Sequence, residues 1–373
     1  MNSKRSSIDN FLVMEILSKA NEIEKKGRRV IHLELGEPLK KTPKPVLEEV
    51  KKSLKIDLPG YTPSNGIPEL RNAISNFYKK KGFKISDNKI FVTVGSSGAF
   101  LLTFIVCFDP GDTVLLFKPC YPAYRNILHS LNLNVIEIDF DEIEKIKKYK
   151  NINGLIISSP NNPTGKIFSY DEVEFLYKFC LERKIRLISD EIYHGIEFER
   201  KSTSICEFGN DGIIINSFSK FFCLPGWRLG WAIIPNELQE NFMKLSQNLF
   251  ISSGSLAQKA AVKVFDCMED LNKNVKIYEQ NRNITFDYLN KTPWSKYSKT
   301  EGGFYTYIDV TDFTNNSSEL VKRILQETLV GLTPGADFDK LNGSKFIRLS
   351  FSCETEALKT GMKRLIDWIN KNY

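Results

Sequence analysis

Short apolar runs alternate with amphipathic segments along the middle of this chain. Apolar runs of this length, bounded by turn-forming residues, are typical of strands that are buried on both faces. The runs that we expect to form such strands are 90–94, 114–117, the run that begins at 154, 185–189 and 213–215. Strands that alternate with helices between 43 and 265 predict an α/β domain with a largely parallel sheet.

The two ends of the chain carry a different mixture of patterns. Between 8 and 26 apolar residues recur at helical spacing, and the strand-like run VIHLEL begins at Val30. Beyond 293 the segments EGGFYTYIDV and KFIRLSF have the composition of strands, and helical patterns begin at 317 and 356. We therefore expect both helices and strands in the terminal regions.

Composition and charge exclude several classes of protein. Of the 373 residues, 42% are hydrophobic and 26% are charged, as in soluble globular proteins. The net charge of +7 is spread over runs that mix both signs, such as EIEKKGRR, which argues against a nucleic-acid surface. The most apolar run, 99–108, is too short to span a bilayer. We expect a cytoplasmic protein without nucleic-acid or membrane partners.

Cysteine usage is typical of a reducing compartment. The seven cysteines are odd in number, include no CxxC pair and have no ligand-like spacing to the three histidines. This pattern disfavours both a disulfide framework and a zinc site, so we expect no metal ion. The N-terminal segment MNSKRSSIDN is polar and shows no evident signal peptide.

The stretch SFSKFFCLPGWRLGW, residues 217–231, is the first candidate for chemistry. It follows the apolar run 213–215, so Lys220 lies just beyond a predicted strand end. A lysine beside small hydroxyl residues suits an amine that bonds a carbonyl cofactor, and Arg228 suits a permanently charged grip on a phosphate. For this segment alone, two surface charges that bracket a loop are the alternative.

Polar residues follow three other predicted strands. Ser96 and Ser97 lie at a strand-to-helix turn, where free N–H groups make a ready phosphate site. Asn162 follows the strand that begins at 154, and Asp190 and Tyr193 follow 185–189. In open α/β sheets ligands bind at this edge of the sheet. Each residue alone has a plain structural alternative, such as a turn asparagine or a helix N-cap aspartate.

Together these motifs resemble the class I and II aminotransferases, fold-type I enzymes whose cofactor is pyridoxal 5'-phosphate (PLP). The resemblance covers nearly the whole chain. It implies an α/β fold with a large PLP-binding domain at 43–270 and a smaller α+β domain made from 1–42 and 271–373. It also implies a homodimer whose active site lies at the subunit interface.

The resemblance gives the residues at the strand ends roles toward PLP. It implies that Lys220 holds PLP as a Schiff base and then moves a proton at the substrate, while Asp190 keeps the pyridine nitrogen protonated. Asn162 and Tyr193 are expected at the phenolic oxygen. Tyr121, in the aromatic loop KPCYPAY, is expected to stack on the pyridine ring, with a core position as the alternative.

Other positions match family elements that bind phosphate or substrate. Tyr61 lies in a YxPxxG element and is expected to reach the phosphate bound by the partner subunit. Gly36, in an LxxGxP element, and Arg348, in KFIRLSF, are expected at the substrate, with Arg348 on its α-carboxylate. Each of these residues also has a structural alternative. Tyr61 could be a packing residue, Gly36 could belong to an ordinary turn, and Arg348 could form an internal salt bridge. The phosphate residues implied by the resemblance are Ser96, Ser97, Ser217, Ser219 and Arg228.

The implied activity is ping-pong transfer of an amino group from an L-amino acid to a 2-oxo acid. A C–S β-lyase or decarboxylase of the same fold is the alternative, because the cofactor motifs serve the same carbanion. Some aspartate aminotransferases carry a lysine near the position of Ser97, and its absence favours broad, aromatic or neutral substrates over aspartate. Candidates to line an apolar pocket, or else to belong to the core, are Phe11, Phe221, Phe222 and Tyr305.

Overall fold

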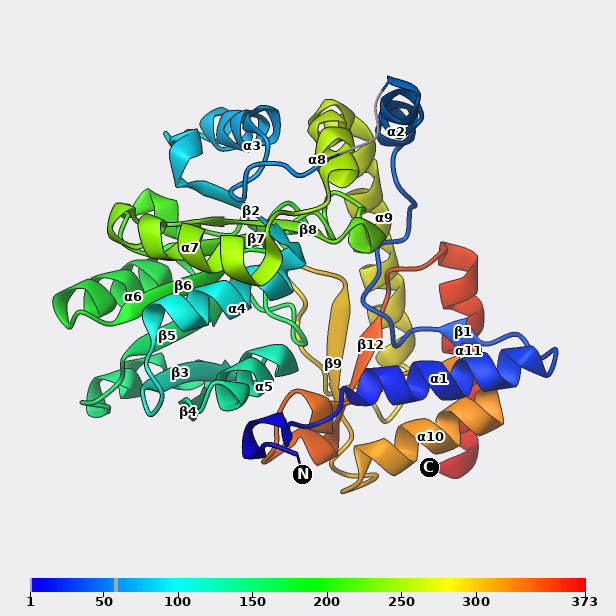
Figure 1. Ribbon diagram of the computed structural model, residues 1–373. Helices are drawn as coiled ribbons and strands as arrows, with labels where there is room; N and C mark the ends of the chain where they lie inside the picture. The colour runs from blue at the N-terminus through cyan, green and yellow to red at the C-terminus, as the bar shows by residue number, and fades with distance from the viewer. Residues whose placement is uncertain (1, 57–59) are drawn as a thin grey trace.

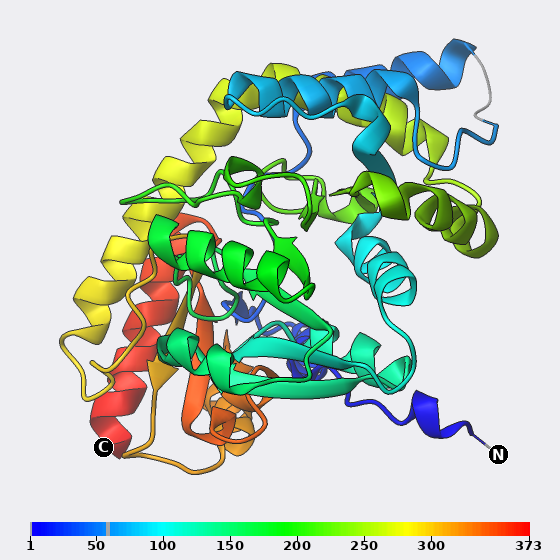
Figure 2. The ribbon, with the colours of Figure 1, turned by 90° about the vertical axis from the view of Figure 1, so that its left-hand side faces the viewer.

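The computed structural model describes residues 2–56 and 60–373. Its larger part is a layered α/β structure, and its smaller part gathers segments from both ends of the chain (Figure 1). The long helix α9, Met268–Leu289, runs from the larger part along the smaller one (Figure 2). The predicted domain boundary at 270/271 falls within the first turn of this helix, and the domain boundaries stay a prediction.

Seven strands of the described chain form the central sheet, in the order β2-β8-β7-β6-β5-β3-β4. Strand β8 is antiparallel to both of its neighbours, and the other neighbouring pairs are parallel. The prediction of an α/β fold with a mostly parallel sheet is therefore confirmed. The bounds are β2 Ile90–Val94, β3 Thr113–Lys118, β4 Asn134–Asp139, β5 Gly154–Ser158, β6 Arg186–Asp190, β7 Ile213–Ser217 and β8 Leu229–Ile233.

Helices cover both faces of this sheet, which explains why its strands read as continuous apolar runs. In β3, Val114 and Leu116 pack into one core, and Leu115 and Phe117 pack into the other. On the first face lie α4 Gly95–Cys107, α5 Pro122–Ser130 and α7 Gln239–Phe250. On the second face lie α3 Pro68–Lys80 and α6 Tyr170–Glu182, with α8 Ser255–Ala261 and α2 Lys44–Ile56 beyond α3 (Figures 1 and 2).

The smaller part is built around two short sheets. Strands β11 Thr333–Pro334, β12 Phe346–Ser350 and β9 Tyr305–Asp309 form an antiparallel sheet in that order. Strand β1 Ile31–His32 pairs in parallel with β10 Val330–Gly331. The helices packed around them are α1 Leu12–Lys25, α10 Ser317–Thr328 and α11 Thr355–Asn372.

Two local predictions differ from the structure. The predicted loop from Lys118 gives way to helix α5 at Pro122, because proline is well suited to the first position of a helix and Tyr121 forms its N-cap. The strand-like run from Val30 forms only the two-residue β1. Beyond it the backbone makes single hydrogen bonds to several neighbours, including one from Ser350 to the carbonyl of Leu33, instead of one regular ladder.

Helix α4 carries the most apolar run of the sequence and is buried as predicted. Ala99, Phe100 and Phe104 lie in the core between α4, the sheet and α7. Among residues 2–56 and 60–373, no helix has both the length and the apolar character that a membrane crossing requires.

Candidate active site

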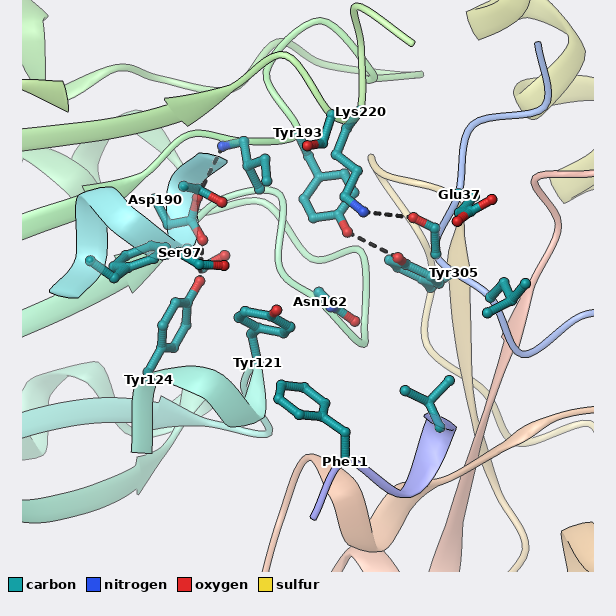
Figure 3. A pocket seen from close by; sticks show the side chains of 18 of the residues that line it. Phe11, Glu37, Ser97, Tyr121, Tyr124, Asn162, Asp190, Tyr193, Lys220 and Tyr305 are labelled. Carbon is teal, nitrogen blue, oxygen red and sulfur yellow. Dashed lines mark hydrogen bonds between the residues drawn. The ribbon is translucent and has the colours of Figure 1, made fainter. Parts of the chain in front are cut away.

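A cavity of about 330 Å³ lies where the carboxyl ends of the central strands face the smaller part of the molecule (Figure 3). Its volume is within the range of small-molecule sites. Segments far apart in the sequence contribute its walls, from the first helix to β12. The predicted site residues that line it are Gly36, Ser96, Ser97, Tyr121, Asn162, Asp190, Tyr193, Ser219, Lys220, Arg228 and Arg348.

The parallel sheet brings the central residues of this set together. Strands β5, β6 and β7 are neighbours, and their registers place Ser158 beside Asp190 and Asp190 beside Ile215. Asn162 and Lys220 follow the ends of the outer two strands. Because parallel strands end at the same edge, three residues separated in sequence meet in one cavity.

Asp190 is a buried carboxylate, and its side chain is aimed into the cavity. The hydroxyl of Tyr124 and the backbone N–H of Ile192 donate hydrogen bonds to it. Burial raises the pKa of Asp190 to about 6, although these hydrogen bonds and the charge of Lys220 oppose the shift. No cation of residues 2–56 and 60–373 forms an ion pair with Asp190, so a protonated ring nitrogen would supply the charge it lacks.

The turn after β5 aims only one of its two asparagines into the cavity. The side-chain oxygen of Asn161 accepts hydrogen bonds from the backbone N–H and the hydroxyl of Thr164, which holds the turn. Asn162 lines the cavity, where its oxygen accepts a hydrogen bond from Nη1 of Arg348 at 2.9 Å. Its amide N–H₂ is the group that this geometry leaves to a bound ligand.

Tyr193 meets Tyr305, which the sequence offered as a candidate to line an apolar pocket or to belong to the core. Its hydroxyl is 3.0 Å from the hydroxyl of Tyr305, the first residue of β9 (Figure 3). Burial raises the pKa of Tyr193 well above its usual value, so the phenol stays neutral and can donate a hydrogen bond to a ligand oxygen.

A phosphate-sized cradle lies at the start of α4. The first N–H groups of a helix have no partner inside the helix, and here they belong to Gly95, Ser96 and Ser97. Gly95 has a φ of +66°, and a Cβ added to it would lie 2.6 Å from Nη2 of Arg228. A Cβ added to Gly230 would lie 2.7 Å from the backbone nitrogen of Ser96. Two glycines thus let the guanidinium and the helix start face one anion.

The two serines before Lys220 occupy different places. Ser219 lines the cavity beside the cradle. Ser217 lies behind it, where its Oγ accepts a hydrogen bond from the N–H of Ser219 at 3.1 Å. The geometry places Ser217 as a support for the turn and Ser219 as the hydroxyl that faces a ligand.

Lys220 extends across the cavity toward the segment that follows β1. Its Nζ donates a hydrogen bond of 2.6 Å to the backbone oxygen of Gly36 (Figure 3). A Cβ added to Gly36 would lie 2.0 Å from the hydroxyl of Tyr305, so no other residue fits this position without movement. Gly36 therefore has a steric role that an ordinary turn would not require.

Arg348 crosses from β12 into the floor of the cavity. Its Nη2 donates to the backbone oxygen of Glu34 at 2.6 Å, and its guanidinium lies 4.2 Å from the ring centre of Tyr305. No carboxylate of the described chain pairs with it, which argues against the internal salt bridge. Its buried Nε has no hydrogen-bond partner among the described residues.

Aromatic and aliphatic side chains form the rest of the wall. Phe11 packs on Tyr121 with ring centres 5.8 Å apart, and Val13 and Met14 follow it along the start of α1. The backbone N–H groups of Leu12 and Val13 donate to the carboxylate of Asp337, which fixes this helix end. Of the four aromatic candidates, Phe11 and Tyr305 line the cavity, whereas Phe221 and Phe222 lie in the core.

Tyr61 does not reach the cavity of its own chain. Its side chain is 86% exposed, and it lies beside the surface segment 252–255. Tyr124 also lines the cavity and was missed as a site residue from the sequence. Tyr124 follows Tyr121 by one helical turn within YPAY, and this spacing is a signal that could have identified it.

Comparison with known proteins identifies the family of this chain. Residues 28–365 match the family Aminotransferase class I and II. The valine–pyruvate aminotransferase of Mycobacterium tuberculosis is 33% identical over 98% of this chain and 97% of its own length. The (5-formylfuran-3-yl)methyl phosphate transaminase of Methanocaldococcus jannaschii is 37% identical over the full length of both chains.

A solved structure supports the same assignment. A crystal structure of an aminotransferase from M. tuberculosis superposes with a TM-score of 0.97 at 33% identity, covering 100% of this chain and 99% of its own. The fold and the cavity define a PLP-dependent enzyme. The chain belongs to the class I and II aminotransferases and is a transaminase. The lyase alternative is not favoured, since these relatives are aminotransferases.

Asp190→Asn tests the electrostatic account of the cavity. The pKa of Asp190 is raised from 3.8 to about 6, so the folded state binds more protons than the unfolded state between these values, and stability falls as pH rises through that window. Without PLP, the variant should therefore be more stable than the wild type at pH 7.5, by up to about 3 kcal/mol, and equally stable at pH 3.5.

Urea denaturation of both apoproteins at the two pH values measures this difference, and a PLP titration completes the test. We expect the variant to bind PLP more weakly, because its neutral amide no longer pairs with the ring nitrogen. A stability gain of the same size at both pH values would contradict the account.

Proposed function

We propose that the residues of the cavity carry out the amino-group transfer of this transaminase in the roles that their positions suggest. The observation that supports this most is the meeting of Lys220, Asp190 and Arg348 in one cavity beside the phosphate cradle. Asp190 would pair with the ring nitrogen of PLP, and Tyr121 would cover one face of the ring. The phenolic oxygen would lie between Asn162 and Tyr193.

The phosphate would be held by groups that already face one point. These groups are the N–H groups of Ser96 and Ser97, the hydroxyl of Ser219 and the guanidinium of Arg228. Arg228 is permanently charged and the helix start offers several donors, so these groups of the protein keep their charge and hydrogen-bonding capacity near neutral pH. A fixed phosphate keeps the reacting end of the cofactor in register with Lys220.

When bound, PLP supplies an electron-accepting ring that stabilises the negative charge left on the substrate α-carbon. The residues of the chain then have separate tasks. Arg348 binds the α-carboxylate and fixes which bond at the α-carbon faces the ring. Lys220, with its amine free, would take the proton from the substrate α-carbon onto its Nζ. Phe11 and its neighbours on α1 exclude water from the cavity.

The substrate side of the cavity favours a neutral, apolar side chain. Val13, Met14, Leu35 and Ile192 line it together with Phe11. The cations that line the whole cavity in the described chain are Lys220, Arg228 and Arg348, and each already has a proposed task. The carboxylate of Glu37, also on the lining, would repel a second carboxylate. The valine substrate named for the M. tuberculosis relative agrees with this class.

A spectroscopic panel tests the substrate class. The PLP-loaded enzyme is mixed with one amino acid at a time, without any oxo acid, and the visible absorbance of the cofactor is followed. We expect valine, leucine and phenylalanine to convert the cofactor to its amine form faster than aspartate, because no free cation meets the aspartate side chain. Faster conversion by aspartate would contradict the proposal, and pyruvate release without conversion would indicate lyase activity.

We propose that two copies of the chain form a homodimer and that Tyr61 acts on the phosphate in the partner. Tyr61 and Ile251 are both exposed, and the segment 252–255, which follows Ile251, lies beside Tyr61. Leu54 and Ile56 of α2 are exposed as well. Large apolar side chains that are exposed in one chain would be buried if this region formed an interface. The free cysteines agree with a cytoplasmic, reducing location.

A hybrid dimer distinguishes action in the partner from action within one chain. One chain carries Lys220→Ala, the other carries Tyr61→Ala, and different affinity tags allow the mixed dimer to be purified. If Tyr61 acts across the interface, one of the two sites keeps both residues, and the hybrid should show about half of the wild-type activity. If each site uses its own Tyr61, both sites are damaged, and the hybrid should show only about half of the activity of the Tyr61→Ala homodimer.

A further inference from the structure

The backbone after β1 holds both cations on the substrate side of the cavity. The carbonyl of Glu34 accepts hydrogen bonds from Nη2 of Arg348 at 2.6 Å and from Oγ1 of Thr333 at 3.0 Å. The carbonyl of Gly36 accepts one from Nζ of Lys220 at 2.6 Å. One short segment thus presents two backbone carbonyls to two charged side chains. A shift of this segment would move Arg348.

The side chain of Glu34 is a fully buried carboxylate that the proposed mechanism does not use. It is 0% exposed, and its Oε1 lies 2.6 Å from Nδ1 of His32. Its Oε2 has no hydrogen-bond partner in the described chain. A Cβ added to Gly331 would lie 2.0 Å from this Oε2, so on this side the carboxylate is packed closely against the β10 backbone. Such a group is costly unless a charged partner meets it.

His32 is that partner. The backbone bends at Glu34, and its carboxylate lies beside the imidazole of His32. On its other side, Nε2 of His32 lies 3.5 Å from Oε1 of Glu24 in α1. The charged groups that face His32 are thus Glu34 from its own segment and Glu24 from the helix packed over it. The hydrogen bond to Glu34 raises the pKa of His32 above 6.5, against the effect of burial.

We propose that His32 and Glu34 are positioning residues for the substrate α-carboxylate, because their ion pair fixes the backbone carbonyl that orients Arg348. This inference rests on the proposed role of Arg348. Glu34 is both the anchored side chain and the residue whose carbonyl touches the guanidinium. Without the charged imidazole, the buried carboxylate would move toward water and take its own carbonyl with it. The affinity for the α-carboxylate would fall, and the chemistry on Lys220 would be affected less.

The test compares two substrates that differ only in the α-carboxylate. Phenylalanine carries this group, and phenethylamine lacks it. Conversion of the bound cofactor to its amine form is followed for both. In His32→Gln we expect kcat/KM for the amino acid to fall about three- to tenfold, mainly through KM, as for one weakened charged hydrogen bond. We expect the rate with the amine, which has no carboxylate for Arg348, to stay unchanged.

Three further variants make the comparison specific. His129→Gln is the matched control, because His129 is an exposed histidine on α5, outside the cavity, and we expect wild-type kinetics. Glu34→Gln should reproduce the effect of His32→Gln. Arg348→Lys should reduce the preference for the amino acid over the amine more strongly than either.

The pH dependence of KM distinguishes this role from a purely structural one, which would leave that pH dependence unchanged. Since the pKa of His32 is raised above 6.5, the ion pair is complete at low pH and is lost as pH rises through that pKa. KM for the amino acid should therefore rise with pH in the wild type and stay flat over this range in His32→Gln. Proton NMR of the apoprotein, which has only three histidines, should show a lower pKa of His32 in Glu34→Gln.

The outcomes separate this inference from the proposed function. If Arg348→Lys leaves the preference for the amino acid unchanged, the role of Arg348 is wrong and the inference falls with it. If Arg348→Lys reduces the preference, His32→Gln could still slow the reactions of the amino acid and the amine equally, or slow neither reaction. In both cases only the positioning role of His32 and Glu34 is overturned. Loss confined to the amino acid, with the expected pH profile, supports it.

Discussion

The carboxylate of Asp190 sets the electrostatics on which the rest of the site depends. It lies at the buried end of β6, and its neighbours in the described chain are hydrogen-bond donors and not a paired cation. A buried carboxylate without a paired cation is unfavourable, and a positively charged group that enters the cavity would stabilise it. The family shown by the comparisons supplies that group in PLP, whose ring nitrogen can carry the proton.

The remaining groups are arranged around this point by the two parts of the molecule. The central sheet contributes the strand ends and the helix start at Gly95, which together would hold the cofactor. The smaller part contributes Arg348 and Tyr305 from its antiparallel sheet, which would hold the substrate. The segment after β1 joins both sets, since its carbonyls receive Lys220 from one part and Arg348 from the other.

Much of the central architecture could be predicted from the sequence. The buried strands are short apolar runs. A polar residue that follows such a run therefore lies at the edge of the sheet where the parallel strands end. This argument placed Asp190 and Lys220, and it favoured Asn162 over Asn161 only through the family resemblance. Tyr61 stays a prediction, because its proposed target lies in another chain.

Other parts of the site depend on contacts that no local pattern contains. Tyr305 meets Gly36 only because β9 and the segment after β1 come together in the folded chain. The same sequence rule that places aromatic residues in a core applies to Phe11 and Phe222, yet only Phe11 lines the cavity. The extent of β1 was also overestimated, because apolar alternation does not reveal whether a neighbouring strand continues beside it.

The most direct test of the central claim is chemical. The enzyme loaded with PLP is reduced with borohydride, digested and examined by mass spectrometry for lysines that carry a pyridoxyl group. The account predicts that the label lies on Lys220, in the peptide that spans the end of β7. A label on another lysine, or one spread over surface lysines with Lys220 unmodified, would contradict it.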